Sequence, residues 1–239
     1  MPDLLRLAGV NTHIGQYHIL QGVDFDVPQN GLTMLLGRNG AGKTTCLRTI
    51  MGLWRASSGK IVFQDREVQR LETPDVARLG IAYVPENMGI FAGLTVRENM
   101  LLAAREGELD ERRLERIFRL FPAMKTFWHG LAGNLSGGQK QMLAISRAIV
   151  EPRKLLLIDE PTKGLAPAII GAMVDAFREL KRDATLLVVE QNFHFARSLG
   201  DAVAVIDSGR IVHTGSMQAL AADAPLQQRL LGLSLESHQ

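Results

Sequence analysis

The 239-residue sequence has one cysteine and almost no net charge. With Cys46 alone, no disulfide can form within the chain, which fits a reducing compartment, and we expect this cysteine to be a small buried residue. The formal net charge of +2 gives no broad attraction for nucleic acid or for an anionic membrane surface. These absences favour an ordinary globular protein.

Long apolar runs are also absent. No stretch approaches the roughly 20 apolar residues that a membrane-spanning helix needs, so we expect that the chain does not cross a bilayer by itself. Residues 1–6 do not have the apolar core of a signal peptide. Any membrane association is therefore expected to come through a partner.

The most informative segment is the glycine-rich stretch at residues 37–45. It follows an apolar run typical of a buried strand and precedes a predicted helix, residues 46–51, that ends at Gly52. This is the setting in which the pattern G-x-x-x-x-G-K-[ST] binds a triphosphate. Lys43 is expected to bridge the β- and γ-phosphates, and the Thr44 hydroxyl to be a Mg²⁺ ligand. The expected nucleotide-binding residues here are Gly37, Arg38, Asn39, Gly40, Ala41, Gly42, Lys43, Thr44 and Thr45.

The rest of the chain alternates between strand and helix patterns. Alternating residues up to about Pro28 predict antiparallel strands. Tyr17 in this region either stacks on an adenine ring or packs on the core as a strand aromatic. Residues 56–60 are predicted as a loop, and residues 87–148 as amphipathic helices. Further strands are predicted at 61–63, 81–84, 155–159, 186–190, 203–207 and 211–212, and helix from about 216 onward.

This pattern predicts an α/β fold with a P-loop core sheet, an N-terminal antiparallel β subdomain and an inserted α-helical subdomain. We expect one domain, residues 1–239. Within it, residues 1–86 and 150–239 are expected to form the nucleotide-binding core, and residues 87–149 the helical subdomain.

Two further motifs accompany the glycine-rich stretch. Ser136 is positioned to cap a predicted helix at residues 140–150, and the glycines beside it expose amide groups at the positive end of that helix. A continuous apolar strand then ends in Asp159 and Glu160. The residues of the first of these motifs are Leu135, Ser136, Gly137, Gly138 and Gln139.

A P-loop, then L-S-G-G-Q, then an apolar strand closed by D-E-P resembles the ATP-binding subunits of ABC transporters over essentially the whole chain. In that family two subunits face head to tail, so that each ATP lies between one P-loop and the other subunit's L-S-G-G-Q. The resemblance implies ATP and Mg²⁺ as cofactors. It also implies that Asp159 holds Mg²⁺ through water and that Glu160 acts as general base on the attacking water.

A closer likeness, to the LivF-type ATPases of branched-chain amino acid importers, is carried by four segments: residues 84–86, 159–167, 190–192 and 229–233. It implies a LivG-type companion ATPase, two membrane permease subunits, a periplasmic binding protein and a place at the cytoplasmic face of the inner membrane. The surface around Phe91, Leu94 and Glu98 would dock a permease helix. The transported solute stays open, because urea, a short amide or another small polar solute would leave the same pattern.

The sequence departs from the family pattern at four positions. Glu86 stands where most members have a Mg²⁺-contacting glutamine, and a carboxylate can still bind Mg²⁺. Gln191 stands where most members have a histidine that contacts the γ-phosphate. Glutamine can donate a hydrogen bond there, but unlike histidine it cannot become cationic. Ala166 replaces an interface aspartate, and Ile14 replaces the usual aromatic before Gly15.

Three of these departures, Glu86, Gln191 and Ala166, suggest the hypothesis that this chain's own P-loop site hydrolyses slowly while its L-S-G-G-Q segment completes the partner's faster site. A largely non-hydrolytic, nucleotide-gated subunit is the alternative, and the intact Glu160 argues against it. A third class, ATPases acting on nucleic acid or ribosomes, would call for tandem cassettes or coiled-coil arms. Only about ninety residues separate the P-loop from L-S-G-G-Q here, which suits a small helical subdomain.

Overall fold

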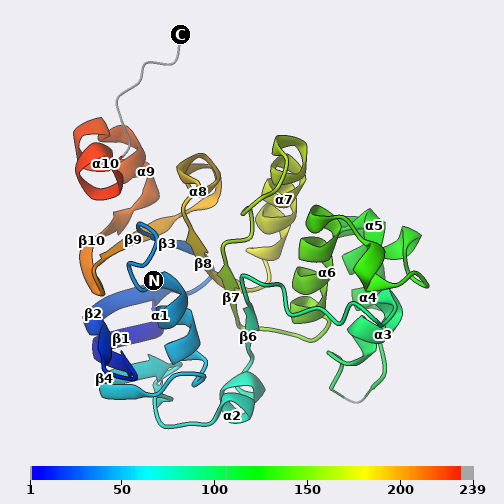
Figure 1. Ribbon diagram of the computed structural model, residues 1–239, viewed down its shortest axis with the longest axis horizontal. Coiled ribbons are helices and arrows are strands. Elements are labelled where there is room, and N and C mark those ends of the chain that lie inside the picture. The colour runs from blue at the N-terminus through cyan, green and yellow to red at the C-terminus, as the bar shows by residue number, and fades with distance from the viewer. Residues whose placement is uncertain (1, 106, 233–239) are drawn as a thin grey trace.

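The computed structural model describes residues 2–105 and 107–232 and contains a four-stranded and a six-stranded sheet (Figure 1). Leu233, the last residue of the LivF-like ending, lies outside the described residues. The strands are β1 (Asp3–Ile14), β2 (Tyr17–Pro28), β3 (Leu32–Leu36), β4 (Ala56–Phe63), β5 (Arg66–Glu67), β6 (Ile81–Val84), β7 (Leu155–Asp159), β8 (Thr185–Glu190), β9 (Ala202–Asp207) and β10 (Arg210–Ser216). The helices are α1 (Lys43–Ile50), α2 (Thr73–Arg78), α3 (Val96–Leu101), α4 (Glu111–Leu120), α5 (Pro122–Thr126), the 3₁₀ turn η1 (Ala132–Asn134), α6 (Gly137–Ile149), α7 (Pro167–Leu180), α8 (Phe193–Leu199), α9 (Met217–Ala222) and α10 (Ala224–Leu231).

The smaller sheet has the order β2-β1-β4-β5 and is antiparallel throughout. The prediction of antiparallel strands up to Pro28 is therefore confirmed. The prediction of a loop at residues 56–60 is wrong, because β4 begins at Ala56 and pairs with β1. Most of that stretch is polar and exposed, so its strand conformation depends on backbone pairing with β1 that the local sequence does not reveal.

The larger sheet has the order β10-β9-β3-β8-β7-β6, and all of its pairs except β10–β9 are parallel. Every residue of β3, β7 and β8 is buried, as expected for strands covered on both faces. Successive side chains point to opposite faces, so Leu156 and Ile158 join one hydrophobic core while Leu155 and Leu157 join the other. The predicted α/β class, with an antiparallel β subdomain, is confirmed.

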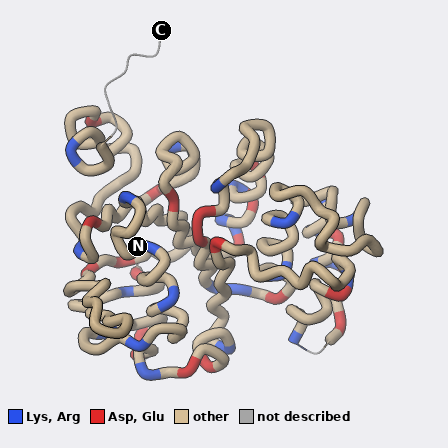
Figure 2. Tube along the Cα trace, viewed as in Figure 1, with Lys and Arg blue, Asp and Glu red and all other residues tan. Residues whose placement is uncertain are grey.

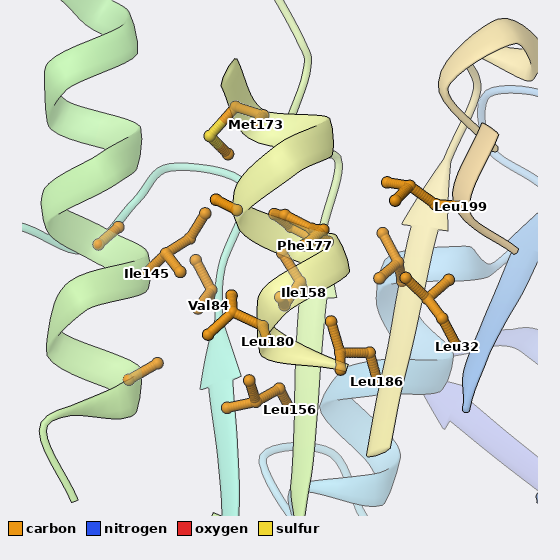
Figure 3. Close-up of a cluster of buried hydrophobic side chains, with 14 of the residues drawn as sticks. Leu32, Val84, Ile145, Leu156, Ile158, Met173, Phe177, Leu180, Leu186 and Leu199 are labelled. Atoms are coloured by element: carbon orange, nitrogen blue, oxygen red, sulfur yellow. The ribbon is translucent and has the colours of Figure 1, made fainter. Parts of the chain in front are cut away.

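The first core lies between the large sheet and helices α6 and α7. Figure 3 shows side chains of both helices, among them Ile145 and Phe177, directed at residues of the neighbouring strands such as Ile158. Phe177 is fully buried and meets Phe195 of α8 edge-on, with ring centroids 5.6 Å apart. This packing fixes α6 and α7 against the strands whose ends carry the motifs.

Both helices that follow a glycine motif begin three residues earlier than predicted. Helix α1 starts at Lys43, directly after the left-handed Gly42, and α6 starts at Gly137, directly after its cap Ser136. Helix α1 ends before Gly52, whose φ of 74° suits a glycine at that position, as predicted. No helix in residues 2–105 and 107–232 has the length and apolar character needed to span a bilayer.

Replacing Phe177 by alanine is expected to lower the free energy of unfolding by about 3–5 kcal/mol, because a cavity would be left between α7, α8 and the sheet. Urea or guanidinium unfolding followed by circular dichroism measures this change. The matched control is Phe127→Ala, since Phe127 is 40% exposed and should cost much less. Equal losses for the two variants would contradict this description of the core.

Candidate functional site

The glycine-rich loop connects the end of β3 to the start of α1, in the middle of the large sheet. Gly37 is buried, and a Cβ at this position would overlap the Ile206 carbonyl oxygen of β9. Gly42 has a φ of 108°, a conformation that other residues rarely adopt, and it is followed at once by the helix. The loop can therefore pass close to β9 and point its amide groups, with the positive end of α1, at one place.

Lys43 is 4% exposed, and its ammonium holds the loop together. Its Nζ donates hydrogen bonds to the carbonyl oxygens of Gly37 at 3.0 Å and Arg38 at 3.1 Å. The same nitrogen lies 3.5 Å from Oε1 of Glu160. The cation thus joins the loop to the acidic end of β7.

Asp159 ends β7 and is fully buried. Its carboxylate accepts hydrogen bonds from the Thr44 hydroxyl at 3.1 Å and the Tyr83 hydroxyl at 3.1 Å. Burial raises the pKa of Asp159, although these hydrogen bonds act in the opposite direction. Burial and the neighbouring Asp159 charge raise the pKa of Tyr83 to about 12, so this phenol stays a hydrogen-bond donor.

The oxygen atoms around Asp159 fit a hard divalent cation. The Thr44 hydroxyl and the Asp159 carboxylate are already in contact, and Glu86 follows the end of the adjacent strand β6. Oxygen ligands of this kind suit Mg²⁺, which binds proteins through one or two carboxylates together with phosphates and water. Within the described ranges, no three His, Cys, Asp or Glu side chains form a metal-binding group by themselves.

Glu160 has an unusual backbone conformation for a non-glycine residue, with a φ of 47°. Its amide donates to the Val189 carbonyl at 2.9 Å, so the neighbouring strand holds it there. The side chain is 10% exposed and lies between two ammonium groups, those of Lys43 at 3.5 Å and Lys163 at 3.4 Å. Left-handed residues of this kind cost about 1–3 kcal/mol and concentrate at functional sites.

Gln191 faces the glycine-rich loop across an open cleft of about 550 Å³. Gln191 directly follows Glu190, the last residue of β8, and its side chain is exposed. The residues that line this cleft are Arg38, Asn39, Gly40, Ala41, Gln191, Asp207 and Ser208.

The L-S-G-G-Q segment is not brought to this cleft. Ser136 and Gln139 form a capping box at the start of α6, with hydrogen bonds of 3.3 Å and 2.9 Å, so the predicted cap is confirmed. In Figure 1, α6 lies across β6 and β7 from α1. A Cβ at Gly138 would come 2.8 Å from Ile169 of α7, whereas Ser136 and Gly137 are exposed.

Three other predicted positions are exposed. Tyr17 is 65% exposed at the start of β2, so the interpretation that it packs on the core is wrong, and its stacking on adenine stays a prediction. Glu86 is exposed and accepts a hydrogen bond from Lys163 at 2.5 Å. Ala166 occupies the N-cap position of α7, where it offers no side-chain acceptor.

Sequence reasoning missed Glu190, a 2%-exposed carboxylate at the end of β8. It accepts hydrogen bonds from the amide and hydroxyl of Thr162 at 3.0 Å and 2.7 Å, and from the amides of Gln191 and Asn192 at 2.9 Å and 3.0 Å. It therefore fixes the loop after Glu160 to the loop that carries Gln191. A charged residue closing a wholly apolar strand was the signal that could have identified it.

Glu190→Gln is expected to lower the free energy of unfolding by about 1–3 kcal/mol, because an amide NH₂ group would face the amide donors of Gln191 and Asn192. Chemical denaturation measures this loss. Glu179→Gln, which neutralises an exposed partner of Arg182, is the control and should change little. A Glu190→Gln variant as stable as the parent would show that the four hydrogen bonds are unimportant.

This chain is similar to known proteins in sequence and in fold. The model of the ABC transporter family matches residues 20–163. The chain is 37% identical over 232 residues to the "High-affinity branched-chain amino acid transport ATP-binding protein BraG" of Pseudomonas aeruginosa, covering 96% of this chain and 100% of that protein. It is 35% identical over 234 residues to the "Probable branched-chain amino acid transport ATP-binding protein LivF" of Archaeoglobus fulgidus, with coverages of 96% and 99%. A solved ATP-binding subunit of an ABC transporter is 28% identical with a TM-score of 0.80, covering 98% of this chain and 96% of that one. With its motifs, fold and relatives in agreement, this chain belongs to the ABC transporter family.

Proposed function

We propose that this chain binds MgATP at residues 37–45 and hydrolyses it as one ATPase subunit of a membrane importer for branched-chain amino acids. The observation that carries the proposal is the contact of Lys43 and Thr44 with Glu160 and Asp159. This contact brings the glycine-rich loop and two carboxylates together at one edge of the sheet, which supports their proposed roles in binding phosphate and a cation. The relatives named above favour amino acid import over urea, amides or a non-hydrolytic role.

In this proposal Lys43 exchanges its two carbonyl contacts for the β- and γ-phosphates of ATP. Thr44, Asp159 and Glu86 would hold Mg²⁺, which neutralises charge on the phosphates when bound. Glu160 acts as general base. Its backbone is fixed by the hydrogen bond from its amide to Val189, and its carboxylate needs only to orient and deprotonate a water molecule. Gln191 donates a hydrogen bond to the γ-phosphate from the opposite side of the cleft.

The second half of the ATP site is proposed to come from another cassette. Residues 135–139 lie away from this chain's own P-loop and present Ser136 and the positive end of a 13-residue helix to solvent. A companion cassette, of the LivG type if the closer likeness extends to partners, would place its nucleotide there. ATP would then add contacts that exist only in the closed pair, so that binding shifts the pair toward closure.

Coupling to a permease is proposed at a groove of about 710 Å³ between the core and residues 87–149, the proposed helical subdomain. Leu53 and Trp54 line it on one side, and the Arg147 guanidinium, which lies over the ring of Phe91 at 5.1 Å, lies on the other. Phe91 is 49% exposed. Glu98 forms a capping box with Thr95 at the start of α3, so its proposed part in docking is to hold this helix end in place. Two permease subunits would thereby hold the ATPase at the cytoplasmic face of the membrane, with a periplasmic binding protein on the other side.

Glu160→Gln is expected to lower ATP hydrolysis at this chain's own P-loop site by at least about 10²-fold, because the amide cannot accept the proton of the attacking water. MgATP affinity should stay within a few-fold of the parent value, since Lys43 and Thr44 are unchanged. Phosphate release and binding of a fluorescent ATP analogue measure the two quantities. Glu115→Gln, on the exposed face of α4, is the control. Undiminished hydrolysis in Glu160→Gln would remove this residue from the mechanism.

In the assembled complex, Ser136→Arg is expected to cost more turnover than Glu160→Gln, if this chain's own site is the slower one and its signature segment serves the faster one. Ser216→Arg is the matched control, because Ser216 caps α9 in the same way and lies outside the proposed site. The measurement is the ATPase rate of the purified complex carrying each variant, compared with that of the parent complex. If Glu160→Gln abolishes turnover and Ser136→Arg barely matters, the asymmetry is wrong.

A further inference from the structure

Lys163, to which the sequence analysis gave no role, forms a cationic bridge between two carboxylates of the proposed site. Its Nζ lies 2.5 Å from Oε1 of Glu86 and 3.4 Å from Oε2 of Glu160. The side chain is 59% exposed, and that of Glu86 is 41% exposed, whereas Glu160 is 10% exposed. The bridge therefore spans from solvent to the protected end of β7.

The surroundings of this ammonium are strongly acidic. Glu86 comes shortly after the end of β6, and Asp159 and Glu160 lie at the end of the adjacent strand β7. Figure 2 shows acidic segments near the centre of the molecule. The pKa of Asp159 is raised first by burial and then by the charges of Glu160 and Glu86. Lys43 balances this group from the side of the P-loop and Lys163 from the side of solvent.

We propose that Lys163 competes with Mg²⁺ for Glu86 and thereby sets the Mg²⁺ concentration at which the site accepts nucleotide. The proposal rests on the proposed function, which makes Glu86 one of the Mg²⁺ ligands. Lys163 is a positioning residue in this scheme. It holds Glu86 and Glu160 in the absence of nucleotide and releases Glu86 when the divalent ion arrives.

The competition follows from geometry and charge. The ammonium of Lys163 is hydrogen-bonded to Oε1 of Glu86 and offsets the charge of that carboxylate, so a metal ion at Glu86 must share the carboxylate with a cation that is already there. A divalent ion beside Glu86 also repels the lysine. Lysine is suited to this exchange, because its charge lies at the end of a flexible, exposed stem and is readily taken up by water.

The test is a Mg²⁺ titration of nucleotide binding to the full chain, with a fluorescent trinitrophenyl-ATP as the probe. Lys163→Met is expected to reduce the Mg²⁺ concentration for half-maximal binding by about two- to fivefold, the range for losing one partly exposed ion pair. Lys163→Arg, which keeps the charge, should stay close to the parent. Lys60→Met, which removes the exposed pair with Glu67 at 2.7 Å, should leave the midpoint unchanged.

A second background separates this mechanism from a general charge effect. In Glu86→Gln, the further change Lys163→Met should shift the midpoint by less than half as much as in the parent. A midpoint that Lys163→Met leaves unchanged or raises, or an equal shift in both backgrounds, would overturn the proposal while the proposed function stands. A parent chain that binds no nucleotide at any Mg²⁺ concentration would overturn both.

Discussion

The site depends on the parallel alignment of four adjacent strands, β3, β8, β7 and β6. Parallel neighbours end at the same edge of a sheet, so the glycine-rich loop, Glu190, the Asp159–Glu160 pair and Glu86 all emerge side by side. The pairing of Leu36 with Glu190 and of Asp159 with Val189 fixes their relative heights. A shift of one residue in either pairing would turn Asp159 away from Thr44, because successive side chains point to opposite faces.

Gathering these acids at one edge is electrostatically unfavourable, and the chain offsets the cost locally. Glu190 is satisfied by four hydrogen bonds, so it acts as a fixed acceptor that links two loops. Asp159 has two hydroxyl donors, and Glu160 has an ammonium on each side. In the proposed function MgATP would bring both negative phosphates and a positive ion to this group. The two lysines, one buried and one exposed, would then be the contacts that change.

Much of this arrangement follows from the sequence because its signals are local. The glycine-rich stretch, the apolar strands and the Ser136 cap each depend on neighbouring residues, and the structure confirms them. The strand at 56–60 was missed because its residues are polar and its order comes from pairing with β1. The role of Lys163 was missed for a related reason. Its contact with Glu86 joins positions 77 residues apart, and nothing in either segment indicates the other.

The separation of the P-loop from the L-S-G-G-Q segment has a physical consequence for the proposed mechanism. In that mechanism the P-loop would supply donors to the phosphates from one side only, and Gln191 lies across a cleft of about 550 Å³ that is open to solvent. Electrostatic stabilisation of a transferring phosphoryl group is strongest where water is excluded. A lone cassette leaves its cleft in contact with water, so a second surface is needed to close it. In the proposed mechanism the exposed start of α6 would provide such a surface for the companion.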